Sequence, residues 1–256
     1  MPKVNIYGMD GTIKEKIDLP KIFETPYRPD IIKKTFEVIH SNQRHPYGSN
    51  PFAGTRHAVA SVGKGRGMSR VPRLTQGQSA ALAPNVVGGR RAHPPKIERD
   101  WREKINKKEN KLARNSALAA TADKEVVIKR GHRFDEKLTL PIVFDDDFEK
   151  IKKTKEMIKV LQKTGIYSDI LRSVNGKHIR AGKGKMRGRK YRIPKSVLIV
   201  STKNIVEKSS NNLSGVDVTK PHQLNIEHLA PGGIAGRLTI FTKSALTQVR
   251  RLKNGL

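Results

Sequence analysis

The chain has 256 residues and carries 52 Lys and Arg against 23 Asp and Glu, a formal net charge of +29. A charge this large points to a polyanionic partner, most commonly nucleic acid, while a 36% share of apolar residues is enough for a folded core. Since the chain has no Cys, disulfides and a zinc ribbon are excluded, and no apolar run approaches the roughly 18 residues of a membrane helix.

The first residues lack the apolar core of a signal peptide, and they predict folded structure instead. Residues 3–17 (KVNIYGMDGTIKEKI) predict two short strands around a turn at Asp10 and Gly11. Residues 28–44 predict a helix. Its expected inner face consists of Ile31, Ile32, Phe36 and Ile39.

The middle of the chain predicts a helix, a strand, and then a strand–helix unit. Residues 106–122 favour a helix whose Asn106 and Glu109 have capping-box spacing, and residues 125–131 (EVVIKRG) are typical of a strand. Residues 140–165 predict a buried strand and then a helix that ends near Gly165. The expected inner face of that helix consists of Ile151, Thr154, Ile158 and Leu161.

The last part of the chain predicts three more strands and a helix. Residues 196–202 and 236–242 are apolar enough for buried strands, residues 215–219 for a short one, and residues 244–252 for a final helix. Apolar strands that alternate with helices indicate one α/β domain over residues 1–256 with a mainly parallel sheet.

A segment of sixty residues between Glu37 and Glu98 contains no acid. It holds nine Lys and Arg, eight Gly and six Pro, so it cannot be an ordinary connection, and loops of this length are usually functional or disordered. We interpret residues 43–97 as a long basic loop inserted in the domain. Its cations are Arg44, Arg56, Lys64, Arg66, Arg70, Arg73, Arg90, Arg91 and Lys96.

A second basic block occupies residues 176–192 (GKHIRAGKGKMRGRKYR), again without an acid and with four Gly. A solvated helix face normally mixes charges of both signs, which neither block does. Together the two blocks favour contact with RNA or DNA, with Arg and Lys on phosphates and few rings for base stacking. The cations of this block are Lys177, Arg180, Lys183, Lys185, Arg187, Arg189, Lys190 and Arg192.

Catalytic and metal-binding alternatives are weaker. Neither glycine-rich block has the spacing of a phosphate loop that precedes a helix. Residues 145–147 (DDD) follow a strand and could bind a metal, but Asp146 and Glu149 have capping spacing, which favours a structural role. The eight His show no metalloenzyme spacing and are expected in solvent or on RNA. We expect no metal and no cofactor. An RNA-processing enzyme, an RNA chaperone and a DNA-compacting protein remain as rival classes.

Several long motifs in order resemble the family of universal large-subunit ribosomal protein number four, in its archaeal–eukaryotic form. The short chain without a long basic extension is more similar to the archaeal members. The resemblance spans residues 3–250. The motifs are RRAHPPK, RNSALAATA, KRGHRF, LPIVFDDDFE, RAGKGKMRGRKYR and LAPGGIAGRLTIFTKSAL.

The resemblance implies a non-enzymatic protein of the large subunit, with a three-layer α/β/α domain bound to large-subunit RNA in the cytoplasm. It also implies that the inserted loop reaches the peptide exit tunnel, opposite another ribosomal protein, and touches the nascent peptide. On this basis the tunnel wall is expected at the loop tip, with residues 67–70 nearest the lumen. The expected wall residues are Arg66, Gly67, Met68, Ser69, Arg70, Val71, Pro72 and Arg73.

Overall fold

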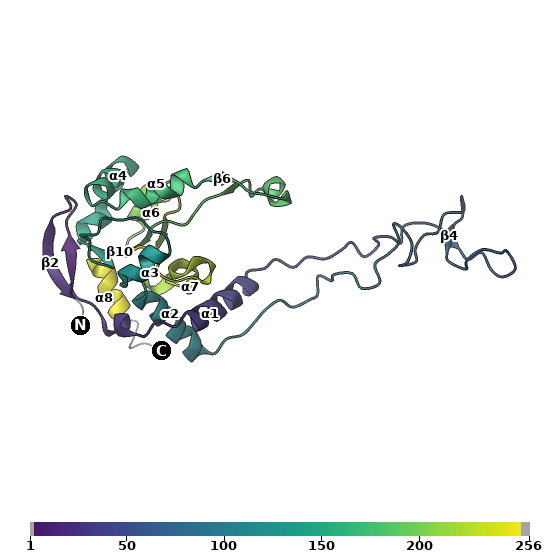
Figure 1. Ribbon diagram of the computed structural model, residues 1–256, viewed down its shortest axis with the longest axis horizontal. Helices are drawn as coiled ribbons and strands as arrows, with labels where there is room; N and C mark the ends of the chain where they lie inside the picture. Colours follow the sequence, from purple (N-terminus) through teal and green to yellow (C-terminus); the bar gives the residue numbers. More distant parts are fainter. Residues whose placement is uncertain (1–2, 252–256) are drawn as a thin grey trace. The chain divides into compact units, whose positions relative to one another are not determined.

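A computed structural model describes residues 3–251, which fall into two units (Figure 1). The first unit combines the residues up to His40 with those from Lys104 onward, and the second comprises Ser41–Glu103. The expected inserted loop, residues 43–97, falls within the second unit, but its role as an insertion into one domain stays a prediction. The ends of the expected domain, residues 1–2 and 252–256, and with them Leu252 of the expected final helix, lie outside the described residues.

The first unit is built on a six-stranded sheet with the strand order β2-β1-β5-β10-β8-β9. Every neighbouring pair is parallel except β1 and β2, which form the predicted antiparallel hairpin. This confirms the predicted α/β fold with a mainly parallel sheet. The strands are β1 (Lys3–Tyr7), β2 (Ile13–Asp18), β5 (Ile142–Phe144), β8 (Leu198–Val200), β9 (Asp217–Thr219) and β10 (Thr239–Thr242).

Helices cover both faces of this sheet. Helices α1, α2, α7 and α8 contribute to the core on one face, and α3, α4, α5 and α6 to the core on the other. The helices are α1 (Pro29–Asn42), α2 (Lys107–Ala119), α3 (Lys124–Lys129), α4 (Thr154–Lys163), α5 (Tyr167–Asn175), α6 (Ile205–Ser210), α7 (Ile226–Leu229) and α8 (Lys243–Arg251). The 3₁₀ turns are η1 (Lys21–Glu24), η2 (Asp146–Lys150), η3 (Lys183–Arg187), η4 (Pro221–Gln223) and η5 (Pro231–Gly233).

The two cores follow from strand alternation, because successive side chains of a strand point to opposite faces. Val143 of β5 belongs to the core beneath α2 and α8, whereas its neighbours Ile142 and Phe144 belong to the core beneath α4 and α5. In strand β8, Leu198 likewise belongs to the first of these cores and its neighbour Ile199 to the second. Such strands are apolar on both faces, which is why they read as continuous apolar runs.

The predicted strand over residues 125–131 is wrong, since these residues form α3. Asp123 caps this helix by accepting a hydrogen bond from the backbone N of Glu125 (3.0 Å), and Gly131 follows it with φ +95°. Val127 is buried while Ile128 is 56% exposed, so only one side of the segment faces a core. The cap and the terminal glycine thus outweigh the strand propensity of Val and Ile.

The predicted capping box at the start of α2 does not form. Asn106 occupies the N-cap position, but its side chain makes no capping hydrogen bond, and Glu109 instead lies 3.3 Å from the ammonium of Lys34 on α1. The helix is held by its buried face against η1 and α7 rather than by its cap.

The predicted inner faces of the other helices are largely correct. In α1, Ile32 is fully buried, and Ile31, Phe36 and Ile39 pack against the same core. In the region of α4, Ile151 and Leu161 are buried as expected, and Thr154 and Ile158 are half-buried. The sequence analysis did not include the buried Met157 and Val160, which complete that face, and Gly165 follows the helix with φ +73° as predicted.

The second unit is mostly irregular. Its only regular pairing among the described residues joins β3 (Val59–Ala60) and β4 (Arg73–Leu74). The stretches of chain around Gly54 and Arg90 approach closely, since a Cβ atom on Gly54 would lie 2.6 Å from the backbone of Arg90. Glycine is therefore required where the outgoing and returning stretches meet.

Candidate nucleic-acid interface

The predicted basic block over residues 176–192 forms a β-hairpin in the first unit, at the label β6 in Figure 1. Strand β6 (His178–Ile179) pairs antiparallel with β7 (Tyr191–Arg192), and the turn η3 lies between them. Gly182 and Gly188 flank the turn with φ values of +74° and +78°, a conformation that residues with a Cβ atom rarely adopt. The glycines of this block thus shape a defined hairpin.

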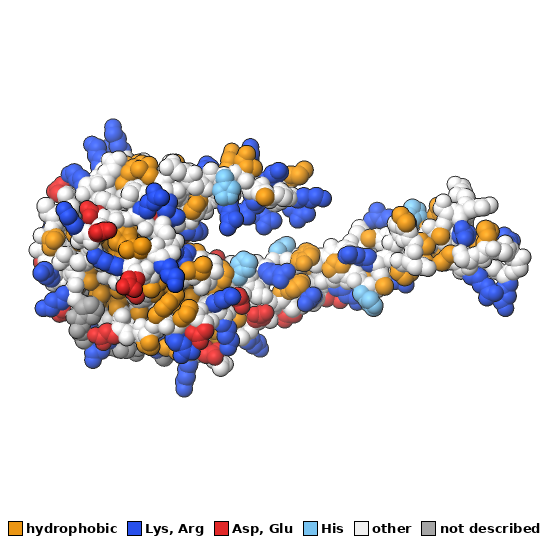
Figure 2. Space-filling view, viewed as in Figure 1, with side chains coloured by type: hydrophobic (Ala, Val, Ile, Leu, Met, Phe, Trp, Pro, Cys, Tyr) orange, Lys and Arg blue, Asp and Glu red, His pale blue; other side chains and the backbone are white. Residues whose placement is uncertain are grey.

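The cations of this hairpin are presented to solvent. Seven of the eight side chains are exposed, and Arg180 is half-buried, with its Nε donating to the carbonyl of Arg189 (3.2 Å). Among the described residues, none of the eight forms an ion pair with a carboxylate. Figure 2 shows Lys and Arg side chains gathered along the hairpin. Their charges are therefore free to neutralise an external anion.

The hairpin also exposes a ring. Tyr191 pairs across the ladder with Ile179, and the ammonium groups of Lys177 and Lys190 lie 4.6 Å and 5.5 Å from the Tyr191 ring centroid. Cation–π contacts of this kind order long Lys side chains that would otherwise move freely.

The stem of the hairpin is fixed to α5 by hydrogen bonds and close packing. The hydroxyl of Ser173 donates to the carbonyl of Pro194 (2.7 Å), and Nη2 of Arg172 donates to the carbonyl of Lys195 (2.9 Å). A Cβ atom on Gly176 would lie 2.6 Å from Pro194 Cγ, so glycine is needed there. The direction in which the cations project is set by these contacts.

A buried network supports the same stem. The Asp169 carboxylate, fully buried on α5, accepts hydrogen bonds from Nε of Arg172 (2.8 Å) and Oγ of Ser196 (2.6 Å), and lies 3.0 Å from Nδ1 of His132. Burial alone would raise the pKa of Asp169, but the hydrogen bonds from His132, Arg172 and Ser196 together hold that pKa below its usual value. The expectation that the His residues lie in solvent or on RNA is wrong for His132, which is buried in this network.

We expect acid to weaken the fold already below pH 6.5. Burial lowers the pKa of His132, and the nearby charges of Arg172 and Arg130 lower it further, whereas Asp169 raises it by a smaller amount. Burial also lowers the pKa of His228. The unfolded chain therefore binds protons that the folded chain does not, and stability falls as pH drops below about 6.5, by up to ~1.4 kcal/mol per pH unit for each His.

Urea unfolding between pH 7.5 and 5.5 measures this slope. The His132→Asn variant can keep a donor towards Asp169 but cannot titrate, so its slope should be smaller than that of the wild type, with His228 providing what remains. An unchanged slope in the variant would show that His132 does not carry the effect.

Arg237 is a fully buried cation next to the hairpin stem. Its guanidinium donates to the carbonyls of Ser196 (2.8 Å) and His228 (2.9 Å) and pairs with the Asp217 carboxylate at 2.6 Å. Burial lowers the pKa of Arg237, yet the adjacent carboxylate and carbonyls keep it charged.

The sequence analysis did not identify either buried charge. Asp169 lies on α5 next to the buried Ile170 and three residues after the buried Ile166, and Arg237 lies two residues before β10. A charge at a position that the period assigns to the core is the signal that could have found them.

In the second unit, the structure divides the predicted tip. Residues 66–70 are exposed, with Gly63, Gly65 and Gly67 all at positive φ. Val71, Pro72 and Arg73 are half-buried instead, because Arg73 starts β4 and donates to the carbonyl of Gln78 and to the hydroxyl of Ser69. Arg73 is thus used within the unit. The other predicted cations, Arg44, Arg56, Lys64, Arg66, Arg70, Arg90, Arg91 and Lys96, are exposed.

The acidic run after β5 has a structural role, as favoured from the sequence, although Asp145 rather than Asp146 is the cap. Asp145 accepts a hydrogen bond from the backbone N of Asp146 (2.8 Å) and pairs with Lys14 (2.6 Å). Asp146 accepts from the backbone N and hydroxyl of Ser244, at the start of α8 (2.9 and 2.6 Å). Acids at these positions satisfy donors at helix starts.

Glu149 closes the edge of the sheet at which α/β proteins commonly bind ligands. It is buried, and it accepts hydrogen bonds from the backbone N and hydroxyl of Thr202 (2.8 and 2.7 Å) and from the hydroxyl of Thr242 (2.7 Å). The carboxylate therefore joins the ends of β8 and β10 to η2. Within the described residues, no group of three potential metal ligands is found.

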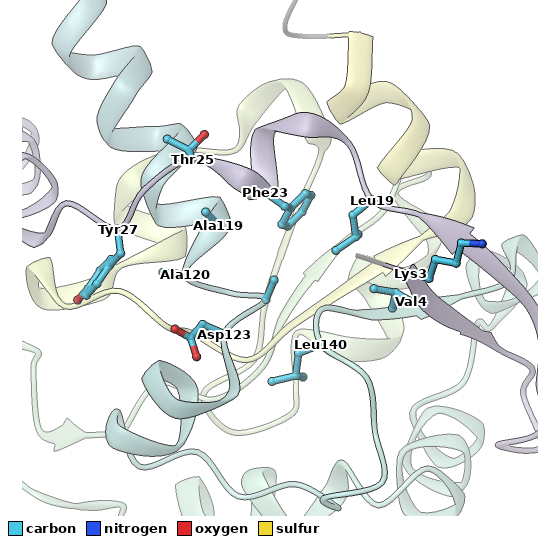
Figure 3. Close-up of a pocket in the computed structure, with 11 residues that line it drawn as sticks. Lys3, Val4, Leu19, Phe23, Thr25, Tyr27, Ala119, Ala120, Asp123 and Leu140 are labelled. Atoms are coloured by element: carbon cyan, nitrogen blue, oxygen red, sulfur yellow. The ribbon is translucent and has the colours of Figure 1, made fainter. Parts of the chain in front are cut away.

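A cavity of about 350 Å³ lies beside β1 and the end of α2 (Figure 3). Its walls include the apolar side chains of Leu19, Phe23 and Leu140, and among its described lining residues only Lys3 and Asp123 are charged. Asp123 is the cap of α3, and the Lys3 ammonium points away from the other lining side chains in Figure 3. The cavity brings no nucleophile next to a base.

The described residues contain no helix that is long and apolar enough to cross a membrane. The α/β domain fills its ligand edge with its own side chains, and two acid-free segments expose many cations; these features are typical of the class of proteins that bind nucleic acid. Comparison with known proteins gives the family: the chain belongs to the ribosomal protein L4/L1 family, whose sequence profile matches residues 17–252.

Three curated relatives, all archaeal and all named large ribosomal subunit protein uL4, are similar along nearly their whole length. The protein of Thermoplasma acidophilum is 48% identical over 250 residues, covering 98% of each chain. That of Methanococcoides burtonii is 50% identical over 250 residues, 97% of this chain and 98% of the relative. That of Methanocaldococcus jannaschii is 49% identical over 249 residues, with the same coverage. The resemblance drawn from the sequence motifs is confirmed.

Proposed function

We propose that this protein is a structural component of the large ribosomal subunit that binds large-subunit RNA through both basic segments. The observation that carries the proposal is the β6–β7 hairpin, whose eight cations have no carboxylate partner among the described residues and project from a stem held to α5 by hydrogen bonds. Its cations neutralise backbone phosphates, and its fixed stem recognises the shape of folded RNA. The near-complete coverage of the uL4 relatives supports the assignment to the large subunit.

The second unit extends this proposal to the peptide exit tunnel. Residues 66–70 are exposed and free of acids, and the three glycines at positive φ in and just before them (Gly63, Gly65 and Gly67) let the backbone turn closely between phosphates. This tip forms part of the tunnel wall and touches the nascent peptide, opposite a second ribosomal protein at the constriction. The protein therefore works in the cytoplasm as a ribosome-bound component, with RNA and neighbouring ribosomal proteins as partners.

Sedimentation of a cell extract tests the assignment. The protein should migrate with the large subunit at close to one copy per particle, even in moderate salt. A free pool, or migration with chromosomal DNA, would contradict the proposal and favour an RNA chaperone or a DNA-compacting protein.

We expect changes at the tip to alter what passes through the tunnel rather than assembly. Met68 and Ser69 carry no charge, so Ser69→Trp should narrow the passage and deletion of residues 67–70 should widen it, while most phosphate contacts remain. A stalling-peptide translation assay should change in opposite directions for the two variants, with near-normal sedimentation profiles.

The matched comparison is Arg90→Gln combined with Arg91→Gln, which removes two exposed cations outside the tip. This variant should reduce assembly and leave stalling unchanged in the subunits that form. Tip variants that fail to assemble but translate normally when incorporated would make the tip an RNA anchor only.

A further inference from the structure

The two ends of the second unit meet around the single Trp of the chain. The hydroxyl of Ser41 donates to the carbonyl of Trp101 (2.6 Å). Asn42 and Glu103 exchange two hydrogen bonds, from the Asn42 side-chain amide to the Glu103 carbonyl (3.2 Å) and from the Glu103 backbone N to Asn42 Oδ1 (2.9 Å). Residues sixty positions apart are thereby held in register.

Two guanidinium groups stack on the same indole. The Cζ atoms of Arg44 and Arg99 lie 3.8 Å and 4.0 Å from the Trp101 ring centroid, and the Tyr47 ring lies nearly parallel to the indole, 10° between planes at 6.1 Å. Two planar cations this close to one centroid cannot share one face of the ring, so they lie on opposite faces. The Trp101 Nε1 has no hydrogen-bond partner, so the indole acts through its faces.

The stacking leaves the hydrogen-bonding edges of both cations unused. Among the described residues, neither Arg44 nor Arg99 forms a side-chain hydrogen bond or an ion pair with a carboxylate. A guanidinium that stacks on a ring through its face still directs five N–H donors outward, in the geometry that binds a phosphate at two points. Two like charges held close to one ring repel each other until anions bind beside them.

Resting on the proposed RNA-binding function, we infer that Arg44 and Arg99, ordered by Trp101, form a phosphate-binding site for the RNA backbone. Trp101 is the positioning residue of this site. The sequence analysis had assigned Arg44 to RNA binding, and the structure adds Arg99 and Trp101 to it. Ordering both cations before RNA arrives removes part of the side-chain entropy that binding would otherwise cost.

The test measures affinity of the full chain for transcribed large-subunit RNA across salt concentrations, after urea unfolding has shown that each variant is folded. Trp101→Leu removes the aromatic faces and should weaken binding about tenfold at fixed salt, whereas Trp101→Phe should retain most of the affinity. Arg44→Gln combined with Arg99→Gln should reduce the log–log salt slope by about 1.4–1.8, the value for two phosphates.

The decisive comparison is Trp101→Leu in two backgrounds. In the Arg44→Gln, Arg99→Gln background, Trp101→Leu should cause no further loss of RNA affinity. In an Arg102→Gln background, where a neighbouring exposed Arg is removed instead, it should cause the same loss of affinity as in the wild type. The inference would be overturned if Trp101→Leu bound RNA with wild-type affinity, or if it lost as much affinity in the Arg44→Gln, Arg99→Gln background as in the wild type. Either result would leave RNA binding itself intact. If the wild-type chain does not bind the transcript, the proposed function fails first.

Discussion

Neutralising five exposed cations of the β6–β7 hairpin should abolish most RNA affinity without unfolding the protein. The variant replaces Lys183, Lys185, Arg187, Arg189 and Arg192 by Gln. Each phosphate contact contributes about 0.7–0.9 to the log–log salt slope, so the slope should fall by roughly 3.5–4.5 and the affinity near 0.1 M salt by on the order of a thousandfold. All five side chains are exposed, so the free energy of unfolding should change little.

The control removes five exposed Lys from other surfaces of the same unit. Replacing Lys129, Lys152, Lys155, Lys159 and Lys208 by Gln lowers the net charge equally, because both variants lose five cations. If net charge alone drives binding, the two variants will lose the same affinity, and the hairpin is not a specific contact surface. A much smaller change in the salt slope for the control would locate the phosphate contacts on the hairpin.

The parallel sheet could be predicted because its signals are local. Each of the segments around β5, β8 and β10 is a short apolar run bounded by turn residues, and a helix follows β5 and β10. Burial on both faces of a parallel sheet requires such runs. Segment 125–131 shows the limit of this reasoning, because its Val and Ile have strand propensity while its cap at Asp123 and its glycine at Gly131 decide for a helix.

The basic segments could be located from sequence, but their geometry could not. Strands of two residues, such as β6 and β7, are too short to show a period of two. The fixed stem depends on Ser173 and Arg172, which bond to carbonyls 21 and 23 positions away. The stacking of Arg44 on Trp101 likewise joins the two ends of the second unit, and composition carries no information on such pairs.

Removing the buried Arg237 should cause the largest loss of stability of any single substitution considered for this protein. In Arg237→Met the Asp217 carboxylate loses its closest partner, at 2.6 Å, and the carbonyls of Ser196 and His228 lose their donor. Asp217 keeps its ion pair with Lys195 (2.9 Å) and is partly exposed, so most of the expected loss of about 3–5 kcal/mol comes from the buried carbonyls that lose their donor, each costing about 1–3 kcal/mol. Urea unfolding should show this as a lower midpoint with an unchanged slope.

Two further variants separate the lost charge from the lost packing. Adding Asp217→Asn to Arg237→Met removes a carboxylate whose remaining cation partner is Lys195, and it should restore only a small part of the stability, because the carbonyl of Ser196 without its donor still costs about 1–3 kcal/mol. Arg250→Met, on the exposed side of α8, should change the free energy of unfolding by less than about 0.5 kcal/mol. If Arg237→Met is as stable as Arg250→Met, water or a shifted neighbour replaces the guanidinium, and the stem of the basic hairpin does not depend on this buried charge.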